Sequence, residues 1–169
     1  DVDYTIRLAQ RLRPYDLEWI EEFLIPEDID GHRAVREAVN WVSLASGEHF
    51  YSLYPYLQII KAGSLDILQP DINWVGGLTV ARKIAHAAEA AGLQVMLHGG
   101  AGNTYGQHFT YATSNSPWLE CFVGTPPGVP LSEAAPPWQA VPEDGWLTPR
   151  EAPGFGIEVE EHWIRPFEY

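Results

Sequence analysis

The chain has 169 residues, which is enough for one domain with a substantial hydrophobic core. Hydrophobic residues make up 46% of it and charged residues 20%, a composition typical of a globular protein rather than a disordered one. The formal net charge of −13 argues against nucleic acid or an anionic membrane as a partner, although a bound divalent metal would still allow a small anionic substrate.

Helical and strand patterns alternate from the first residue. A helix is predicted over residues 1–13, where Pro14 ends it, and a strand over 17–20 leads into Glu21. Helices are then predicted over 30–39, 54–62 and around 107–113, and strands over 41–45, 65–68, 93–97 and 117–122.

The clearest unit is residues 65–100. A helical stripe of alanine and isoleucine around Ile84 ends at Gly92, between two short apolar runs of the kind that form strands buried on both faces. This is the pattern of a strand–helix–strand crossover with parallel strands. Asp71 follows the first strand and His98 ends the second, where α/β proteins place their chemistry.

Five acidic or imidazole side chains recur at a regular spacing. Glu21, Glu48, Asp71, His98 and Glu120 are separated by 27, 23, 27 and 22 residues, and each is predicted at the C-terminal end of a strand. One strand, one helix and two loops take about that length in a (β/α)₈ barrel of roughly 250 residues. We therefore expect an α/β fold, in which residues 1–123 form the C-terminal part of a TIM-type barrel, roughly strands 4 to 8.

Residues 124–169 are rich in proline, which leaves no room for a long helix or a central strand. This segment is either an ordered extension, packing on the barrel or on a capping domain, or a linker. Its aromatic residues favour the packed interpretation, because disordered tails are poor in them: Trp138, Trp146, Phe155, Trp163, Phe167 and Tyr169.

Glu21 and Glu48 on adjacent strand ends suit a hard divalent cation such as Mg²⁺. Two carboxylates alone make an incomplete site, so a third ligand is expected upstream of Asp1. The alternative for either glutamate is a solvated charge on a loop.

His98 is the candidate general base, since imidazole titrates near neutral pH. Asp71, one strand away, is placed to orient the ring, and Glu120 across the pocket to hydrogen-bond a developing oxyanion. The alternatives are a structural histidine for His98 and a residue capping the barrel rim for Glu120.

Other side chains carry weaker signals. His49 and Trp74 are candidates for contact with the substrate, with an indirect supporting role equally open for His49. His32 is expected to be solvated, as are His86 and His162. Cys121 follows Glu120 in the predicted strand and is expected to be buried and inert. As the single cysteine, it excludes an internal disulfide and indicates a reducing, cytoplasmic compartment.

Several motifs resemble the enolase superfamily, and within it the mandelate racemase subgroup. They are the runs at 19–22 (WIEE), 47–49 (GEH), 69–71 (QPD) with 75–79 (VGGLT), 98–100 (HGG) and 115–120 (NSPWLE). The runs at 47–49, 69–74 and 153–158 look most like L-rhamnonate dehydratases and their close relatives.

The resemblance implies a magnesium-dependent lyase of sugar acids. Glu21 and Glu48 would be the second and third metal ligands, His98 the base, Asp71 its partner and Glu120 the acid that stabilises the enolate. Loss of the 3-hydroxyl would then give a 2-keto-3-deoxy acid, from L-rhamnonate or a similar aldonate.

The resemblance also implies that this chain is a piece of a longer homo-oligomeric protein and is inactive alone. The first metal ligand and the substrate-reading capping domain would lie outside it. Three alternatives stay open: a dehydratase of another acid such as fuconate or galactarate, a racemase such as one acting on mandelate, and a non-catalytic barrel subunit. The chain also lacks any long apolar run or signal-peptide pattern, so no membrane partner is expected.

Overall fold

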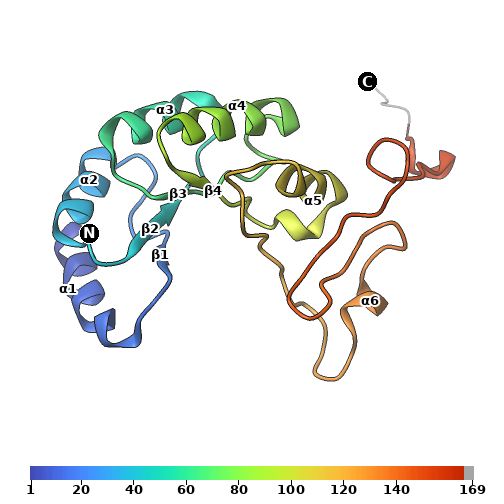
Figure 1. The fold of residues 1–169 in the computed structure, drawn as a ribbon, viewed down its shortest axis with the longest axis horizontal. Coiled ribbons are helices and arrows are strands. Elements are labelled where there is room, and N and C mark those ends of the chain that lie inside the picture. Colours follow the sequence, from blue (N-terminus) through green and yellow to red (C-terminus); the bar gives the residue numbers. More distant parts are fainter. Residues whose placement is uncertain (166–169) are drawn as a thin grey trace.

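The computed structural model describes residues 1–165 (Figure 1). Its strands are β1 (Trp19–Glu21), β2 (Ser43–Ser46), β3 (Ile67–Leu68) and β4 (Gln94–Val95). Its helices are α1 (Val2–Leu12), α2 (Ile29–Ala38), α3 (Leu53–Ala62), α4 (Gly77–Ala90), α5 (Thr104–Tyr111) and α6 (Leu131–Ala134), with 3-10 turns η1 (Arg13–Tyr15), η2 (Gly100–Gly102) and η3 (Glu161–Trp163). In the part of the chain described here, no helix is long and apolar enough to cross a membrane.

Helices α1 and α2 begin where a side chain accepts a hydrogen bond from a free backbone N–H. Asp1 caps α1 by accepting from the N–H of Tyr4 at 2.8 Å, and Asp28 caps α2 in the same way. Gly63 ends α3 in the left-handed conformation. The predicted helices over 1–13, 30–39 and 54–62 are therefore confirmed to within a few residues.

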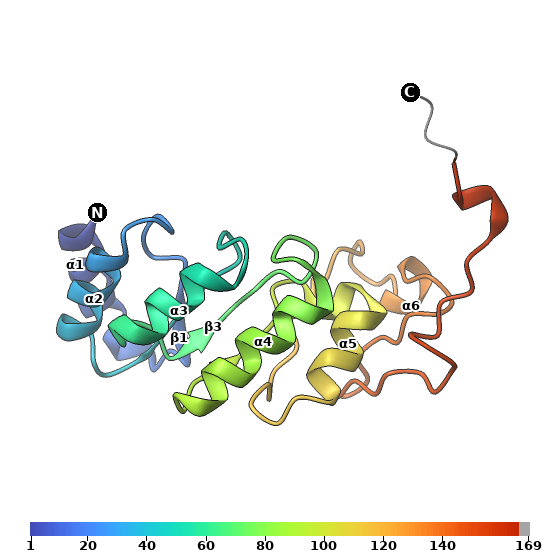
Figure 2. The ribbon, with the colours of Figure 1, turned by 90° about the horizontal axis from the view of Figure 1, so that it is seen from above.

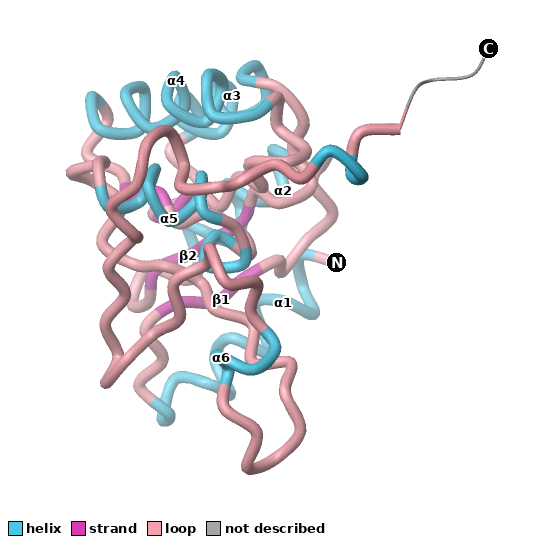
Figure 3. The backbone as a smooth tube through the Cα atoms, turned by 90° about the vertical axis from the view of Figure 1, so that its right-hand side faces the viewer, coloured by secondary structure: helices cyan, strands magenta, loops and turns pink. Residues whose placement is uncertain are grey.

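The strands form one parallel sheet in the order β1-β2-β3-β4. Helices α1 to α4 arch over one side of it (Figures 1 and 3), and neighbouring helices pack against each other in chain order along the molecule (Figure 2). This arrangement of strand, covering helix and next parallel strand confirms the predicted α/β class.

Alternation along the strands separates an outer face from an inner one. Leu44, Leu68 and Val95 point outward into the core beneath the helices. On the inner face, Ala45, Ile67 and Met96 form a small cluster against Trp19. Side chains two residues further along each chain should share this inner face at the carboxyl end of the sheet, which is where Glu21, Gly47, Gln69 and His98 lie.

The strand predicted over 117–122 is wrong. This segment makes isolated backbone contacts: the carbonyl of Asn115 accepts from Val95 N–H at 2.9 Å and that of Glu120 accepts from Ala101 N–H at 2.9 Å. Pro117 has no N–H to donate, and Phe122 is 86% exposed, unlike a residue of a buried strand.

The proline-rich segment touches the barrel part at several points. The Gln107 side chain donates to the carbonyl of Ala140 at 2.9 Å, and the Gln139 side chain donates to that of Ala101 at 3.1 Å. Trp146, by contrast, is 82% exposed. The division at residues 123 and 124 stays a prediction, and Phe167 and Tyr169 lie outside the described residues.

Candidate active site

Glu21 is the last residue of β1, and two N–H groups hold its carboxylate. Its Oε2 accepts from Trp19 Nε1 at 3.0 Å and from Gln69 Nε2 at 2.7 Å. Gln69 follows β3, so this second bond reaches across the end of β2. Both bonds end on the same oxygen and orient the carboxylate. The rest of the Glu21 side chain is exposed to solvent.

Gly47 makes this crossing possible. It has a φ of +146°, and a Cβ there would lie 2.9 Å from the backbone nitrogen of Gln69. Its carbonyl accepts from the buried Tyr56 hydroxyl at 2.6 Å and from the Phe50 N–H at 2.9 Å. The result is a tight turn, in which Gly47 must be glycine and which presents Glu48 at the edge of the sheet.

His98 lies between two carboxylates. Its Nδ1 is 3.0 Å from Asp71 Oδ2 and its Nε2 is 3.5 Å from Glu48 Oε2. The backbone ladder continues beyond the strands, since the N–H of His98 donates to the carbonyl of Pro70 at 3.2 Å. This extended register places Asp71 directly opposite His98, and the hydrogen bond expected between them is present.

The surroundings of His98 favour its protonated form. Burial lowers the pKa of the ring, but the hydrogen bond to Asp71 and the negative charges of Glu48, Glu120 and Asp71 outweigh it and raise the pKa above the ordinary histidine value. The ring is therefore a stronger base than a free imidazole.

Asp71 is 7% exposed and each of its carboxylate oxygens has a partner. Oδ2 faces His98, and Oδ1 accepts from the backbone N–H of Asn73 at 2.7 Å. The backbone carbonyl of Asp71 also accepts from the N–H groups of Trp74 and Val75, which closes a turn around this residue. The fold thus fixes the carboxylate against the ring.

Glu120 approaches the same place from a loop instead of a strand end. Its Oε2 accepts from the backbone N–H of Gly99 at 2.6 Å. That bond brings the carboxylate beside the residue that follows His98, close enough for its charge to act on the ring. Its role as an acid stays a prediction.

Three aromatic rings form a half-exposed wall beside His98. The His49 and Trp74 rings stack with centroids 5.8 Å apart, Tyr51 lies 6.2 Å from Trp74, and Trp74 lies 6.5 Å from His98. Trp74 is 50% exposed. The wall therefore lies next to His98, and contact of His49 and Trp74 with a substrate stays a prediction.

Oxygen donors suited to magnesium gather at the β1, β2 and β3 ends. They are the carboxylates of Glu21 and Glu48 and the buried Oε1 of Gln69, which has no hydrogen-bond partner. Within residues 1–165 no group of three or more His, Cys, Asp or Glu side chains is arranged to hold a metal. Glu21 and Glu48 could supply two oxygen ligands of such a site, and their binding of Mg²⁺ stays a prediction.

Gln69 and Glu22 support the site, and no role was predicted for either from the sequence. Gln69 orients Glu21, and Glu22 Oε1 accepts from Ser46 Oγ at 2.6 Å and from Gly47 N–H at 3.1 Å, which secures the turn before Glu48. Strand alternation held a signal for both, because Gln69 falls on the inner face beside Glu21 and Glu22 falls on the opposite one.

Two minor predictions are wrong. His32 is fully buried rather than solvated: its ring packs between Phe23 and Phe50, and its Nδ1 lies 2.8 Å from the carbonyl of Asp28. Its spacing of three residues from buried Val35 indicated the buried stripe of α2. Cys121 is half-exposed instead of buried, and partial burial raises the pKa of its thiol.

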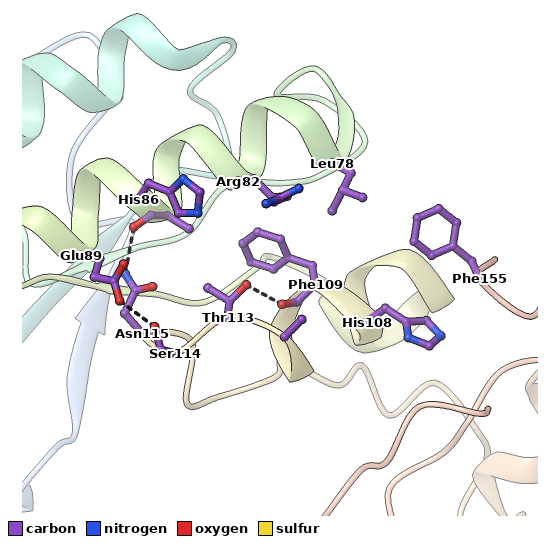
Figure 4. Close-up of a pocket in the computed structure, with 12 residues that line it drawn as sticks. Leu78, Arg82, His86, Glu89, His108, Phe109, Thr113, Ser114, Asn115 and Phe155 are labelled. Carbon is purple, nitrogen blue, oxygen red and sulfur yellow. Dashed lines mark hydrogen bonds between the residues drawn. The ribbon is translucent and has the colours of Figure 1, made fainter. Parts of the chain in front are cut away.

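A cavity of about 340 Å³ lies elsewhere, between α4 and α5 (Figure 4). His86, His108 and Phe109 line it, and Phe155 of the proline-rich segment closes one end. None of the predicted site residues contributes to it. It is separate from the constellation around His98, which lies at an open edge of the sheet.

Residues 1–163 match the family model described as "Enolase C-terminal domain-like". The chain belongs to this family. The resemblance indicated by the sequence motifs is thereby confirmed, and so is the assignment of the parallel sheet to the enolase type of barrel.

The similar proteins include several sugar-acid dehydratases. The chain is 36% identical over 175 residues to L-rhamnonate dehydratase of Saccharopolyspora erythraea, covering 100% of this chain and 44% of that protein. It is 38% identical to the crystal structure of rhamnonate dehydratase from Gibberella zeae complexed with Mg, with a TM-score of 0.67 and coverage of 71% and 29%. L-Talarate dehydratase from Polaromonas sp. JS666, complexed with Mg and L-glucarate, is 29% identical with a TM-score of 0.80, covering 96% of this chain and 42% of that one. The chain thus spans less than half the length of each of these relatives.

Proposed function

We propose that this chain carries the base and part of the metal site of a magnesium-dependent acid-sugar dehydratase. The observation that carries the proposal is the position of His98 between Asp71 and Glu48. Asp71 engages Nδ1, so Nε2 is the nitrogen that faces the predicted metal ligand. A substrate held at that ligand would present its α-proton to Nε2.

In this proposal, some of the residues bind the metal ion and others take part in proton transfer. Glu21 and Glu48 would hold Mg²⁺, which when bound neutralises the substrate carboxylate and lowers the barrier to loss of the α-proton. His98 removes that proton, and Asp71 stabilises the imidazolium that results. Glu120 would hydrogen-bond the oxygen on which charge develops only after taking up a proton, because its charged carboxylate has no donor. The 3-hydroxyl then leaves as water, with His98 returning the proton, and the enol becomes a 2-keto-3-deoxy acid.

The substrate we propose is L-rhamnonate or a similar aldonate. The names of the relatives that are 36% to 38% identical support this, together with the half-exposed aromatic wall of His49 and Trp74, which suits the edge of a carbon chain. A racemase from Streptomyces coelicolor A3(2), solved with bound magnesium, is 37% identical with a TM-score of 0.66, covering 72% of this chain and 35% of that one. Racemisation is therefore the second candidate, because it shares the first proton abstraction.

The test is an assay of the full-length protein against a panel of sugar acids with magnesium in D₂O. Formation of a 2-keto acid together with exchange of the α-proton supports dehydration. Exchange with inversion and no keto acid indicates the racemase. Neither exchange nor product with any acid overturns the proposal and favours a non-catalytic barrel.

A further inference from the structure

A chain of contacts runs from α5 to the candidate base. The Tyr105 hydroxyl donates to Asn73 Oδ1 at 2.5 Å, and the Asn73 backbone N–H donates to Asp71 Oδ1 at 2.7 Å. The other oxygen of Asp71 lies 3.0 Å from His98 Nδ1. Three hydrogen bonds therefore connect a residue on a helix with the ring proposed to remove the α-proton.

Asp71 and Asn73 lie in the loop between β3 and α4, just past the ladder bond from the His98 N–H to the carbonyl of Pro70. The terminal torsion of an aspartate is broad, so its carboxylate turns easily unless both oxygens are engaged. The Asn73 N–H engages one of them. The Asn73 side chain is in turn hydrogen-bonded by Tyr105, which lies 32 residues away in the sequence.

The Tyr105 ring is itself supported from two sides. It packs against the core beneath the helices, and Phe155 of the proline-rich segment meets it edge-on, with centroids 6.1 Å apart and an interplanar angle of 73°. A ring confined in this way keeps its hydroxyl in one place. The support arises from elements outside the β3–α4 loop, so the loop is anchored to a separate part of the fold.

Fold stability does not account for this contact. The Tyr105–Asn73 bond is exposed to solvent, where water can replace either partner at little cost. The same loop is already held by the burial of Ile72 and Val75. What the bond adds is the orientation of Asn73, and through it the direction of the Asp71 carboxylate.

We propose that Tyr105 is a positioning residue that, through Asn73, fixes the Asp71 carboxylate against His98. The proposal rests on the proposed function for its kinetic consequence, although its structural consequence can be measured without any substrate. Tyr105 and Asn73 touch neither the predicted metal ligands nor the nitrogen of His98 that would receive the proton.

The kinetic test uses Tyr105→Phe in the full-length protein with magnesium and its sugar acid. We expect kcat for α-proton exchange to fall about 3- to 10-fold with KM unchanged, because a misoriented His98 ring weakens proton transfer without changing the groups that bind the substrate. Asn73→Ala, which keeps the backbone N–H, should give the same loss. The double variant should lose no more than either single one, since both changes break the same chain.

The control is Tyr111→Phe, on the same helix, whose side chain is 72% exposed. It should leave kcat, KM and the melting temperature unchanged. A kcat of Tyr105→Phe equal to that of Tyr111→Phe would overturn the proposal. So would a rise in KM alone, which would make Tyr105 a substrate contact, or losses in the two single variants that multiply in the double.

A spectroscopic test separates this inference from the proposed function. In the metal-free protein, the Nδ1 proton of His98 in its hydrogen bond to Asp71 should give a low-field NMR resonance. We expect Tyr105→Phe to shift or broaden that resonance and Tyr111→Phe to leave it in place. If no sugar acid is a substrate and the resonance still responds, only the proposed function fails; an unmoved resonance refutes the positioning role even in an active enzyme.

Discussion

Replacing Tyr56 with phenylalanine tests how the turn that carries Glu48 is held. The Tyr56 hydroxyl is fully buried and donates to the carbonyl of Gly47 at 2.6 Å, with the carbonyl of Phe50 further away at 3.2 Å. Burial, followed by the negative charges of Asp71 and Glu22, raises the pKa of this hydroxyl, so it stays protonated and remains a donor.

The expected loss of stability follows from what remains after the change. A buried hydrogen bond contributes about 1 kcal/mol net; the Gly47 carbonyl keeps its second donor, the Phe50 N–H at 2.9 Å, whereas the Phe50 carbonyl loses the longer contact at 3.2 Å. The ring keeps its edge-to-face contact with Phe50, with centroids 5.5 Å apart. We therefore expect a loss of about 1–1.5 kcal/mol, which in a domain of this size lowers Tm by about 2–6 °C.

The assay compares thermal unfolding of Tyr56→Phe with that of Tyr54→Phe. Tyr54 lies on the same helix and is 74% exposed, so its hydroxyl should contribute nothing. Magnesium affinity, measured by calorimetry on the full-length protein, should fall for Tyr56→Phe alone, because the loosened turn carries Glu48. Equal Tm values for the two variants would refute the stability estimate, and a lower Tm with unchanged magnesium affinity would refute the link between this turn and the metal site.

Four further predictions concern the site and the sheet. His98→Asn should reduce α-proton exchange by about 10²- to 10⁴-fold while magnesium affinity is retained; undiminished exchange would identify another residue as the base. In metal-free protein, NMR titration should place the pKa of His98 above the ordinary value and Asp71→Asn should lower it. Since the raised pKa belongs to the folded state, the stability that this pair contributes is present below about pH 6.5 and is lost as the pH rises through the raised pKa; denaturation of Asp71→Asn and wild type across that range should converge at high pH. Glu48→Gln should abolish magnesium-dependent turnover, and turnover without magnesium dependence would contradict the ligand assignment. Within residues 1–165, β1 and β4 pair on one side only, so the isolated 169-residue chain should associate non-specifically; a monomeric product in sedimentation with a cooperative melt would show that its edges are protected.

The sequence predicted the sheet and its helices because both signals are local. Helix α4 was expected from its stripe of small apolar residues, and its end at Gly92 from a glycine that adopts a φ of +74°. The Asp71–His98 contact was predicted for a similar reason: two side chains that end neighbouring parallel strands must meet at one edge.

Features that depend on distant partners were missed. The segment over 117–122 has the apolar content of a strand, but whether a strand forms depends on a neighbour that offers a continuous ladder. Strand alternation places Gln69 on the same face as Glu21, but their hydrogen bond also depends on the turn at Gly47, where the Gln69 side chain crosses the end of β2. His32 was misplaced because its polarity was weighed above its position on the buried stripe of α2.

The backbone bond between His98 and Pro70 has a consequence for motion in the site. Because Asp71 is covalently next to Pro70, the base and its partner are tied through the main chain as well as through their side chains. Glu48 contacts the His98 ring through a side chain from another segment, and Glu120 accepts from the N–H of the neighbouring Gly99. Thermal fluctuation should therefore carry His98 and Asp71 together as one body, with their separation varying less than that between His98 and Glu48. On warming, the distance between His98 and Asp71 should stay nearly constant, while the distance from His98 to Glu48, the proposed metal ligand, becomes more variable.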